Sequence, residues 1–225
     1  MHRAGQPSCR FESDNLDILH CALFVRDAAA LPVRGSADVP PALIGEIPVR
    51  HLTWPELDRA IAGEQWLIWW RQMLNQAVRE AQIRRAEDPA QDMRTRMLAR
   101  VEGRHEVFDP PEFDGLSPMA ELRSAVVALL PEYRAWSAGT SRNSAPGQDR
   151  FSWQLVRDAA HLVAAQLGVS VDEMDAVAHV LDVQGCWSYV VGAGCGVCSV
   201  GAAVGHDTAS ALLRELFMSG STAGV

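Results

Sequence analysis

The sequence has no lysine, so all 20 of its basic side chains are arginine. Without lysine the chain cannot form a Schiff base through its own amines or hold a phosphate with a P-loop lysine. With 28 acidic residues the net charge is −8, and such a chain lacks the basic surface that nucleic acids require. These absences exclude lysine-dependent catalysis and argue against nucleic acid as a partner.

Cysteines and long apolar segments are also few. Five cysteines in 225 residues favour reduced thiols in the cytoplasm over a disulfide framework. Residues 1–10 contain no apolar segment of the kind found in secretory signals. The uncharged run 183–205 is long enough to span a bilayer, but its polar residues and glycines favour a segment buried within protein. We therefore expect a soluble, cytoplasmic protein that does not enter a membrane.

The apolar periodicity of the chain is mostly helical. Apolar side chains recur at helical spacing in several segments joined by short turns, among them 117–130, 151–167 and 207–216. A proline-rich stretch, 31–49, interrupts this pattern and has room for short strands. The sequence thus predicts a mainly α fold, a bundle of amphipathic helix pairs with a proline-rich loop region near the N-terminus.

Residues 137–149 have the composition of a linker, with serine, glycine, asparagine and proline. We therefore expect an N-terminal helical region at 1–136 and a C-terminal helical subdomain at 150–225. The charge differs between them: 79–104 holds seven arginines and five acidic residues, whereas 158–215 holds one arginine and seven acidic residues. Such asymmetry suits contact with a charged partner or with a second copy of the chain.

A tryptophan-rich helix is the clearest periodic element. From residue 64 to about 86, Trp66, Trp69, Trp70 and Met73 fall on one helical face with smaller apolar residues. A stripe of this kind usually packs in the core, but aromatic side chains also line small-molecule pockets and protein interfaces. We carry these four residues forward as candidates for a pocket or an interface.

The segment 186–199 is rich in glycine and cysteine and permits three interpretations. Cys195 and Cys198, spaced C-x-x-C, could hold a metal ion or exchange a disulfide, with Cys186 and His206 as further ligands. The glycines around residue 194 also resemble a dinucleotide-binding loop, although the third glycine and the βαβ context are missing. We favour a third interpretation, close packing of a small-residue helix, which predicts that Cys195 and Cys198 are buried.

The spacing of 171–182 is compatible with a helix that follows a turn at Gly168. On this helix Val177 and Leu181 would face inward, and His179 would lie among carboxylates on a solvated face. The turn resembles that of helix-turn-helix regulators, but the second helix would be acidic and phosphates would repel it. A helical hairpin is the preferred interpretation.

No complete catalytic set is visible in the sequence. Our first hypothesis is a soluble helical protein that acts by binding a protein partner or by self-association, and no cofactor is predicted. The alternatives are an enzyme for a small molecule, with a pocket beside the tryptophan helix and a thiol or metal site at Cys195 and Cys198, and a helix-turn-helix regulator. Whether the protein is an enzyme stays open at this stage.

Overall fold

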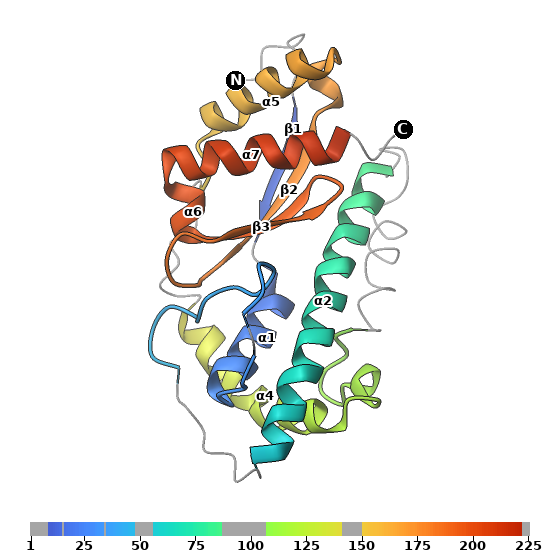
Figure 1. The fold of residues 1–225 in the computed structure, drawn as a ribbon, viewed down its shortest axis with the longest axis vertical. Helices are drawn as coiled ribbons and strands as arrows, with labels where there is room; N and C mark the ends of the chain where they lie inside the picture. Colours follow the sequence, from blue (N-terminus) through green and yellow to red (C-terminus); the bar gives the residue numbers. More distant parts are fainter. Residues whose placement is uncertain are drawn as a thin grey trace. The chain divides into compact units, whose positions relative to one another are not determined.

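The computed structural model describes residues 9–14, 16–33, 35–47, 56–86, 107–140 and 150–221. The chain forms two units (Figure 1). Unit 1 consists of 1–15 and 149–225, and unit 2 consists of 16–148. Unit 2 is therefore an insertion within unit 1, and the first strand of the chain belongs with the C-terminal residues.

Unit 1 is built on a mixed sheet with the strand order β1-β2-β4-β3. β1, β2 and β4 run parallel, and β3 pairs antiparallel with β4 at one edge. β1 forms the opposite edge, and four of its five side chains are exposed. The strands are β1 (Arg10–Asp14), β2 (Asp175–Leu181), β3 (Ser188–Gly192) and β4 (Cys195–Ser199).

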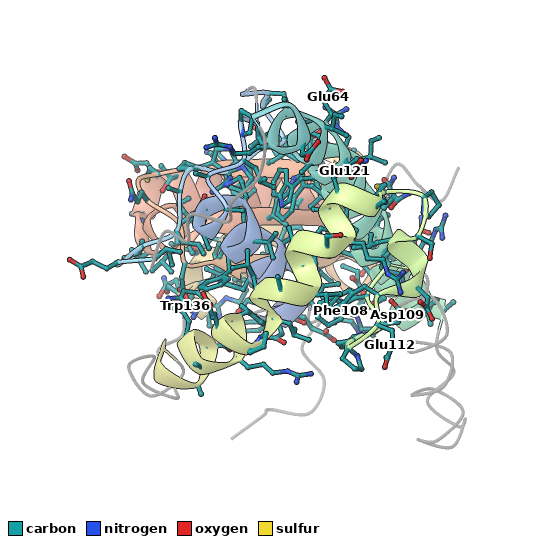
Figure 2. All side chains as sticks on the ribbon, turned by 90° about the horizontal axis from the view of Figure 1, so that it is seen from below. Glu64, Phe108, Asp109, Glu112, Glu121 and Trp136 are labelled. Atoms are coloured by element: carbon teal, nitrogen blue, oxygen red, sulfur yellow. The ribbon has the colours of Figure 1, made fainter. Side chains whose placement is uncertain are left out.

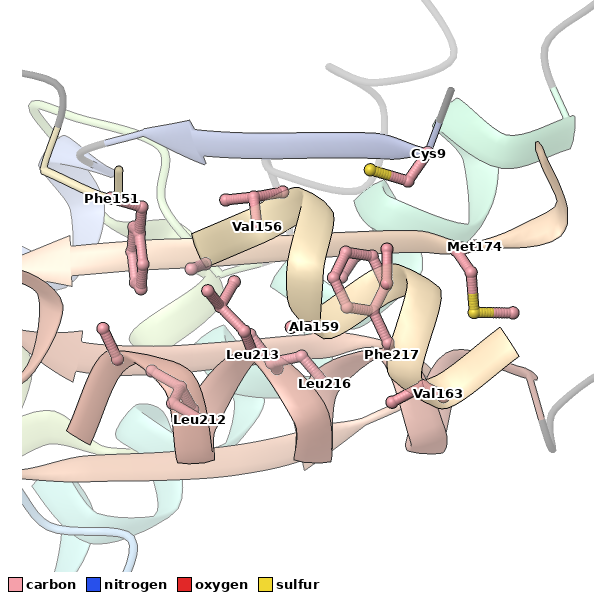
Figure 3. Packing of buried hydrophobic residues seen from close by; sticks show 14 of the residues in the cluster. Cys9, Phe151, Val156, Ala159, Val163, Met174, Leu212, Leu213, Leu216 and Phe217 are labelled. Atoms are coloured by element: carbon pink, nitrogen blue, oxygen red, sulfur yellow. The ribbon is translucent and has the colours of Figure 1, made fainter. Parts of the chain in front are cut away.

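Two helices, α5 (Trp153–Leu167) and α7 (His206–Ser221), cover one face of this sheet. Figure 3 shows side chains of α7 such as Leu213 and Phe217 directed toward Val156 and Ala159 of α5. Every second residue of β2 joins the same buried cluster, namely Ala176, Ala178 and Val180. The alternation follows from strand geometry, in which successive side chains point to opposite faces. The short helix α6 (Val200–Val204) connects β4 to α7.

The prediction of a mainly α, all-helical bundle is wrong, because unit 1 contains this four-stranded sheet. Residues 175–181, expected on a helix, form β2, a strand buried on both faces. Strands covered on both faces carry apolar residues at nearly every position, so their sequences lack the alternation that would separate them from a buried helix. The turn at Gly168 leads through a 3₁₀ turn at Val171–Glu173 into β2, and not into a second helix.

The glycine-rich segment is a hairpin followed by α6, and not the predicted close-packed helix. Gly192, Ala193 and Gly194 all have positive φ angles, which form the turn between β3 and β4. The small residues do serve close packing, however. A Cβ atom on Gly196 would lie 2.7 Å from Leu216 Cδ2, so glycine at this position lets α7 approach the sheet.

Among its described residues, unit 2 contains three mutually packed helices. They are α1 (Asp17–Ala28), α2 (Glu56–Ala86) and α4 (Ala120–Thr140), with a 3₁₀ turn at Asp114–Leu116. Trp66 and Trp70 stack with centroids 5.4 Å apart. The proline-rich loop is fixed to α1 by Arg26, which donates hydrogen bonds to the carbonyls of Pro40 and Pro41. Helical periodicity was sufficient to predict which side of α2 lies in the core, since its predicted apolar face is buried throughout.

Figure 2 shows the segment before α4, with Phe108, Asp109 and Glu112 beside one another and Glu121 near the beginning of the helix. Arg123 fastens this segment by donating to the Glu112 carbonyl at 2.9 Å. Most of the predicted linker, 141–149, lies outside the described residues. Within those ranges, no helix is long and apolar enough to cross a bilayer.

Candidate functional site: a thiol, an imidazole and a carboxylate on one sheet face

The two cysteines of the C-x-x-C pair lie on opposite faces of β4. Cys198 belongs to the cluster beneath α5 and α7, whereas Cys195 points to the other face with Val197. Both side chains are fully buried, as predicted. Burial raises the pKa of Cys198 to about 12, because an apolar surrounding disfavours the thiolate. Cys198 is therefore an inert packing residue, and the two thiols cannot act as a pair without rearrangement.

Cys195 shares its face with His179 of the neighbouring strand. In the register of β2 with β4, Val177 is the partner of Cys195 and His179 the partner of Val197. Residues two apart on a strand point to the same face, so Cys195 and His179 are diagonal neighbours. In the register of β1 with β2, Asp14 lies directly opposite His179. Three adjacent parallel strands thus bring a thiol, an imidazole and a carboxylate into one row.

The His179–Asp14 contact is short and joins a buried group to a solvated one. His179 Nδ1 lies 2.6 Å from Asp14 Oδ1. The His179 side chain is 1% exposed, whereas that of Asp14 is 42% exposed. A hydrogen bond from Nδ1 to the carboxylate fixes the orientation of the ring and directs Nε2 into the protein. The row therefore has one end at the surface and the other in the interior.

The pKa of His179 is set by opposing effects. Burial alone lowers it, because the charged ring loses its hydration. The hydrogen bond to Asp14, an interaction with Cys195 outside ordinary hydrogen-bond geometry and the electrostatic attraction of both groups raise it to about 9. These contributions favour the protonated form of the ring. A buried cationic imidazole beside a thiol is an arrangement that supports nucleophilic chemistry at sulfur.

His179 Nε2 is the remaining polar atom of this row. It is buried, and none of the described residues forms a hydrogen bond of ordinary geometry with it. Buried polar atoms normally have partners, and a missing partner costs roughly 1–3 kcal/mol. Because Nδ1 is already used by Asp14, Nε2 is the atom that can exchange a proton with a reacting molecule at Cys195.

The proposed metal ligands are not brought together. Cys186 and His206 are exposed, with Cys186 Sγ 4.0 Å from Thr208 Oγ1 and His206 Nδ1 3.2 Å from Asp207. Cys195 and Cys198 are instead inside the sheet. Over the described ranges, no group of three or more histidine, cysteine or acidic side chains is arranged to hold a metal ion.

The tryptophan stripe is explained by packing within unit 2. Trp66, Trp69, Trp70 and Met73 are fully buried. Each of the three indole N–H groups donates a 2.7 Å hydrogen bond to a backbone carbonyl, those of Ala22, Val107 and Asp38. Their polar atoms are therefore satisfied inside the protein. A pocket or interface at these residues stays a prediction.

Sequence reasoning missed both partners of Cys195. His179 was placed on a solvated helical face, but in β2 it is buried. Asp14 and His179 are 165 residues apart in the sequence, and only the parallel pairing of β1 with β2 places them opposite each other. The available signal was the run of small apolar residues on both sides of His179, which suits a strand buried on both faces.

Comparison of this chain with protein families, with curated proteins and with solved structures finds no match.

Proposed function

We propose that this protein is an enzyme that carries out covalent chemistry through the thiol of Cys195. His179 exchanges protons with the reacting groups through Nε2, and Asp14 orients the ring. The observation that carries the proposal is the row of these three side chains on one face of β4, β2 and β1, with a 2.6 Å contact between ring and carboxylate. A nucleophile, a proton-exchanging base and a group that orients the base are the parts that nucleophilic catalysis requires.

The burial of the site supports a proposal for its substrate class. Cys195 is 0% exposed and His179 1% exposed, so a bulky or charged molecule has no route to the sulfur in the folded sheet. Small neutral molecules enter protein interiors through local opening at low free-energy cost. We therefore propose a small, uncharged electrophile as substrate, with no metal ion or organic cofactor. The free state of all five cysteines suits a reducing compartment, and we propose the cytoplasm.

Alkylation by two reagents of different size tests this function. The native protein is treated with iodoacetamide, which is small and neutral, and in parallel with a bulky polyethylene-glycol maleimide, and the labelled peptides are quantified by mass spectrometry. We expect iodoacetamide to modify Cys195 well before Cys198, and the bulky reagent to modify only the exposed Cys186. Cys198→Ser is the matched control, because it removes the other buried thiol of β4. Equal protection of Cys195 and Cys198 until unfolding contradicts the proposal.

Self-association is the second candidate function, and exposed apolar side chains on α5 favour it. Trp153 is 52% exposed and Leu162 44% exposed, although large apolar side chains usually lie inside. We propose a second copy as the occupant, because the arginine-rich run 79–104 is opposite in charge to the acidic run 158–215. Sedimentation velocity over a concentration series should show a dimer that Trp153→Ala and high salt both weaken. A monomer at every concentration contradicts this candidate.

A further inference from the structure

The row of Cys195, His179 and Asp14 has one property that limits the reactions it can catalyse. Cys195 belongs to β4, which is paired on both sides, by β2 and by β3. The backbone amides of such a strand are used in the hydrogen bonds of the sheet, so they are not available to stabilise an oxyanion. Acyl transfer, which develops negative charge on a carbonyl oxygen, is therefore poorly served at this site.

A reaction whose leaving group takes up a proton is served well. The row supplies one proton donor beside the sulfur, His179 Nε2, which is buried and has no hydrogen-bond partner of ordinary geometry among the described residues. Hydroperoxides fit this donor, because the departing hydroxide needs a proton and the molecule is small and uncharged.

Resting on the proposed function of Cys195, we propose that its substrate is hydrogen peroxide and that the thiol is oxidised to a sulfenic acid.

The proposed step is balanced in atoms and electrons. The sulfur of Cys195 attacks one peroxide oxygen, an S–O bond forms, and the O–O bond breaks. The departing hydroxide takes the proton from His179 Nε2 and leaves as water, while the thiol proton replaces it on the ring. Sulfur loses two electrons and the peroxide gains them, so that thiol and peroxide give sulfenic acid and water. Asp14 holds the ring through Nδ1 during the exchange.

The return to the thiol requires an external reductant. Cys198 points to the opposite face of β4, and Cys186 lies at the surface beside Thr208, so neither of them faces the oxidised sulfur. A small thiol would condense with the sulfenic acid to a mixed disulfide with release of water. A second thiol molecule would then release Cys195 as the thiol and leave as the symmetrical disulfide.

The test compares oxidation with alkylation at the same sulfur. The full chain is treated with hydrogen peroxide in the presence of dimedone, which traps sulfenic acids, and the adducts are located by mass spectrometry. We expect the adduct at Cys195, formed faster than at the exposed Cys186. Cys195→Ser should abolish it, and Cys198→Ser should leave it unchanged.

The role of the ring is separated from a structural role by the leaving group. In alkylation by iodoacetamide the leaving group is iodide, which needs no proton. In oxidation by peroxide the leaving group is hydroxide, which needs one. His179→Gln should therefore slow oxidation roughly 100-fold and alkylation far less. If this variant does not fold, Asp14→Asn keeps the ring and changes an exposed partner, and it should slow oxidation at pH 8 in the same selective way. Equal slowing of both reactions contradicts the proposed proton transfer.

The two proposals fail in different ways. Rapid alkylation of Cys195 with no faster oxidation than at Cys186 overturns the peroxide inference and leaves the proposed thiol function in place. Protection of Cys195 from iodoacetamide and from peroxide until unfolding overturns both. Trapping at Cys195 that is fast, and selectively slowed in the His179 or Asp14 variant, supports both.

Discussion

The His179–Asp14 pair predicts that the stability of unit 1 depends on pH within a defined window. The pKa of His179 is raised to about 9 in the folded protein, against 6.5 for an ordinary histidine. A group whose pKa rises on folding stabilises the fold fully below its unfolded value. That contribution is lost as the pH rises through the folded value. Stability should therefore be highest below about pH 6.5 and fall between 6.5 and 9.

The size of the effect follows from the two pKa values and from the exposure of the partner. The difference between 6.5 and about 9 corresponds to roughly 3 kcal/mol. The Asp14 side chain is 42% exposed, and solvent screens part of its attraction. We therefore expect wild-type protein to lose about 1–3 kcal/mol of unfolding free energy across the window.

Urea titrations followed by far-ultraviolet circular dichroism at pH 6, 7.5 and 9 measure this loss. Asp14→Asn should be less stable than wild type by about 1–3 kcal/mol at pH 6 and nearly equal to it above pH 9. Asp158→Asn is the matched control, since it removes the same charge from an exposed position on α5. The thiols of Cys21 and Cys198 do not titrate within this window, because burial raises their pKa values. Wild-type stability that is constant from pH 6 to 9 would refute the reasoning.

Three further predictions concern packing, and thermal unfolding measures each of them. Gly196→Ala places a methyl group 2.7 Å from an α7 side chain and should cost about 1–3 kcal/mol, whereas Gly139→Ala, with nothing within 4 Å, should stabilise α4 by up to about 1 kcal/mol. Phe217→Ala empties a fully buried position beneath α5 and should cost about 3–5 kcal/mol, without affecting the pH dependence described above. Trp70→Phe leaves the Asp38 carbonyl without its 2.7 Å hydrogen bond and should cost roughly 1–3 kcal/mol.

The long helix α2 of unit 2 was readable from the sequence because it presents one apolar face. Trp66, Trp69 and Trp70 fall on the buried side of α2, as a period of 3.6 residues predicts. Gly63 lies inside the continuous helix α2. Its missing side chain lets the Pro32 carbonyl approach, 3.0 Å from where a Cβ would be. Local periodicity thus gives the helix, while the reason for its glycine lies in a distant loop.

The sheet of unit 1 was not readable in the same way. β2 is buried on both faces, and its residues can be arranged as a helical stripe as readily as a strand, which is how His179 came to be assigned to solvent. The site depends on parallel pairing between strands that are far apart in the chain. Neither the spacing around Cys195 nor that around Asp14 contains this information. The thiol was found from its own motif, and its two partners only from the register.

The insertion of unit 2 has a consequence for the order of events during synthesis. β1 pairs with β2, and Asp14 and His179 are 165 residues apart. At the usual rate of translation, roughly 10–30 s pass between the synthesis of β1 and that of its partner strand β2. Unit 2 is continuous in sequence and can fold during that interval, with β1 held as an unpaired edge. The row proposed above therefore cannot exist until β4, which carries Cys195, has been synthesised and has paired with β2.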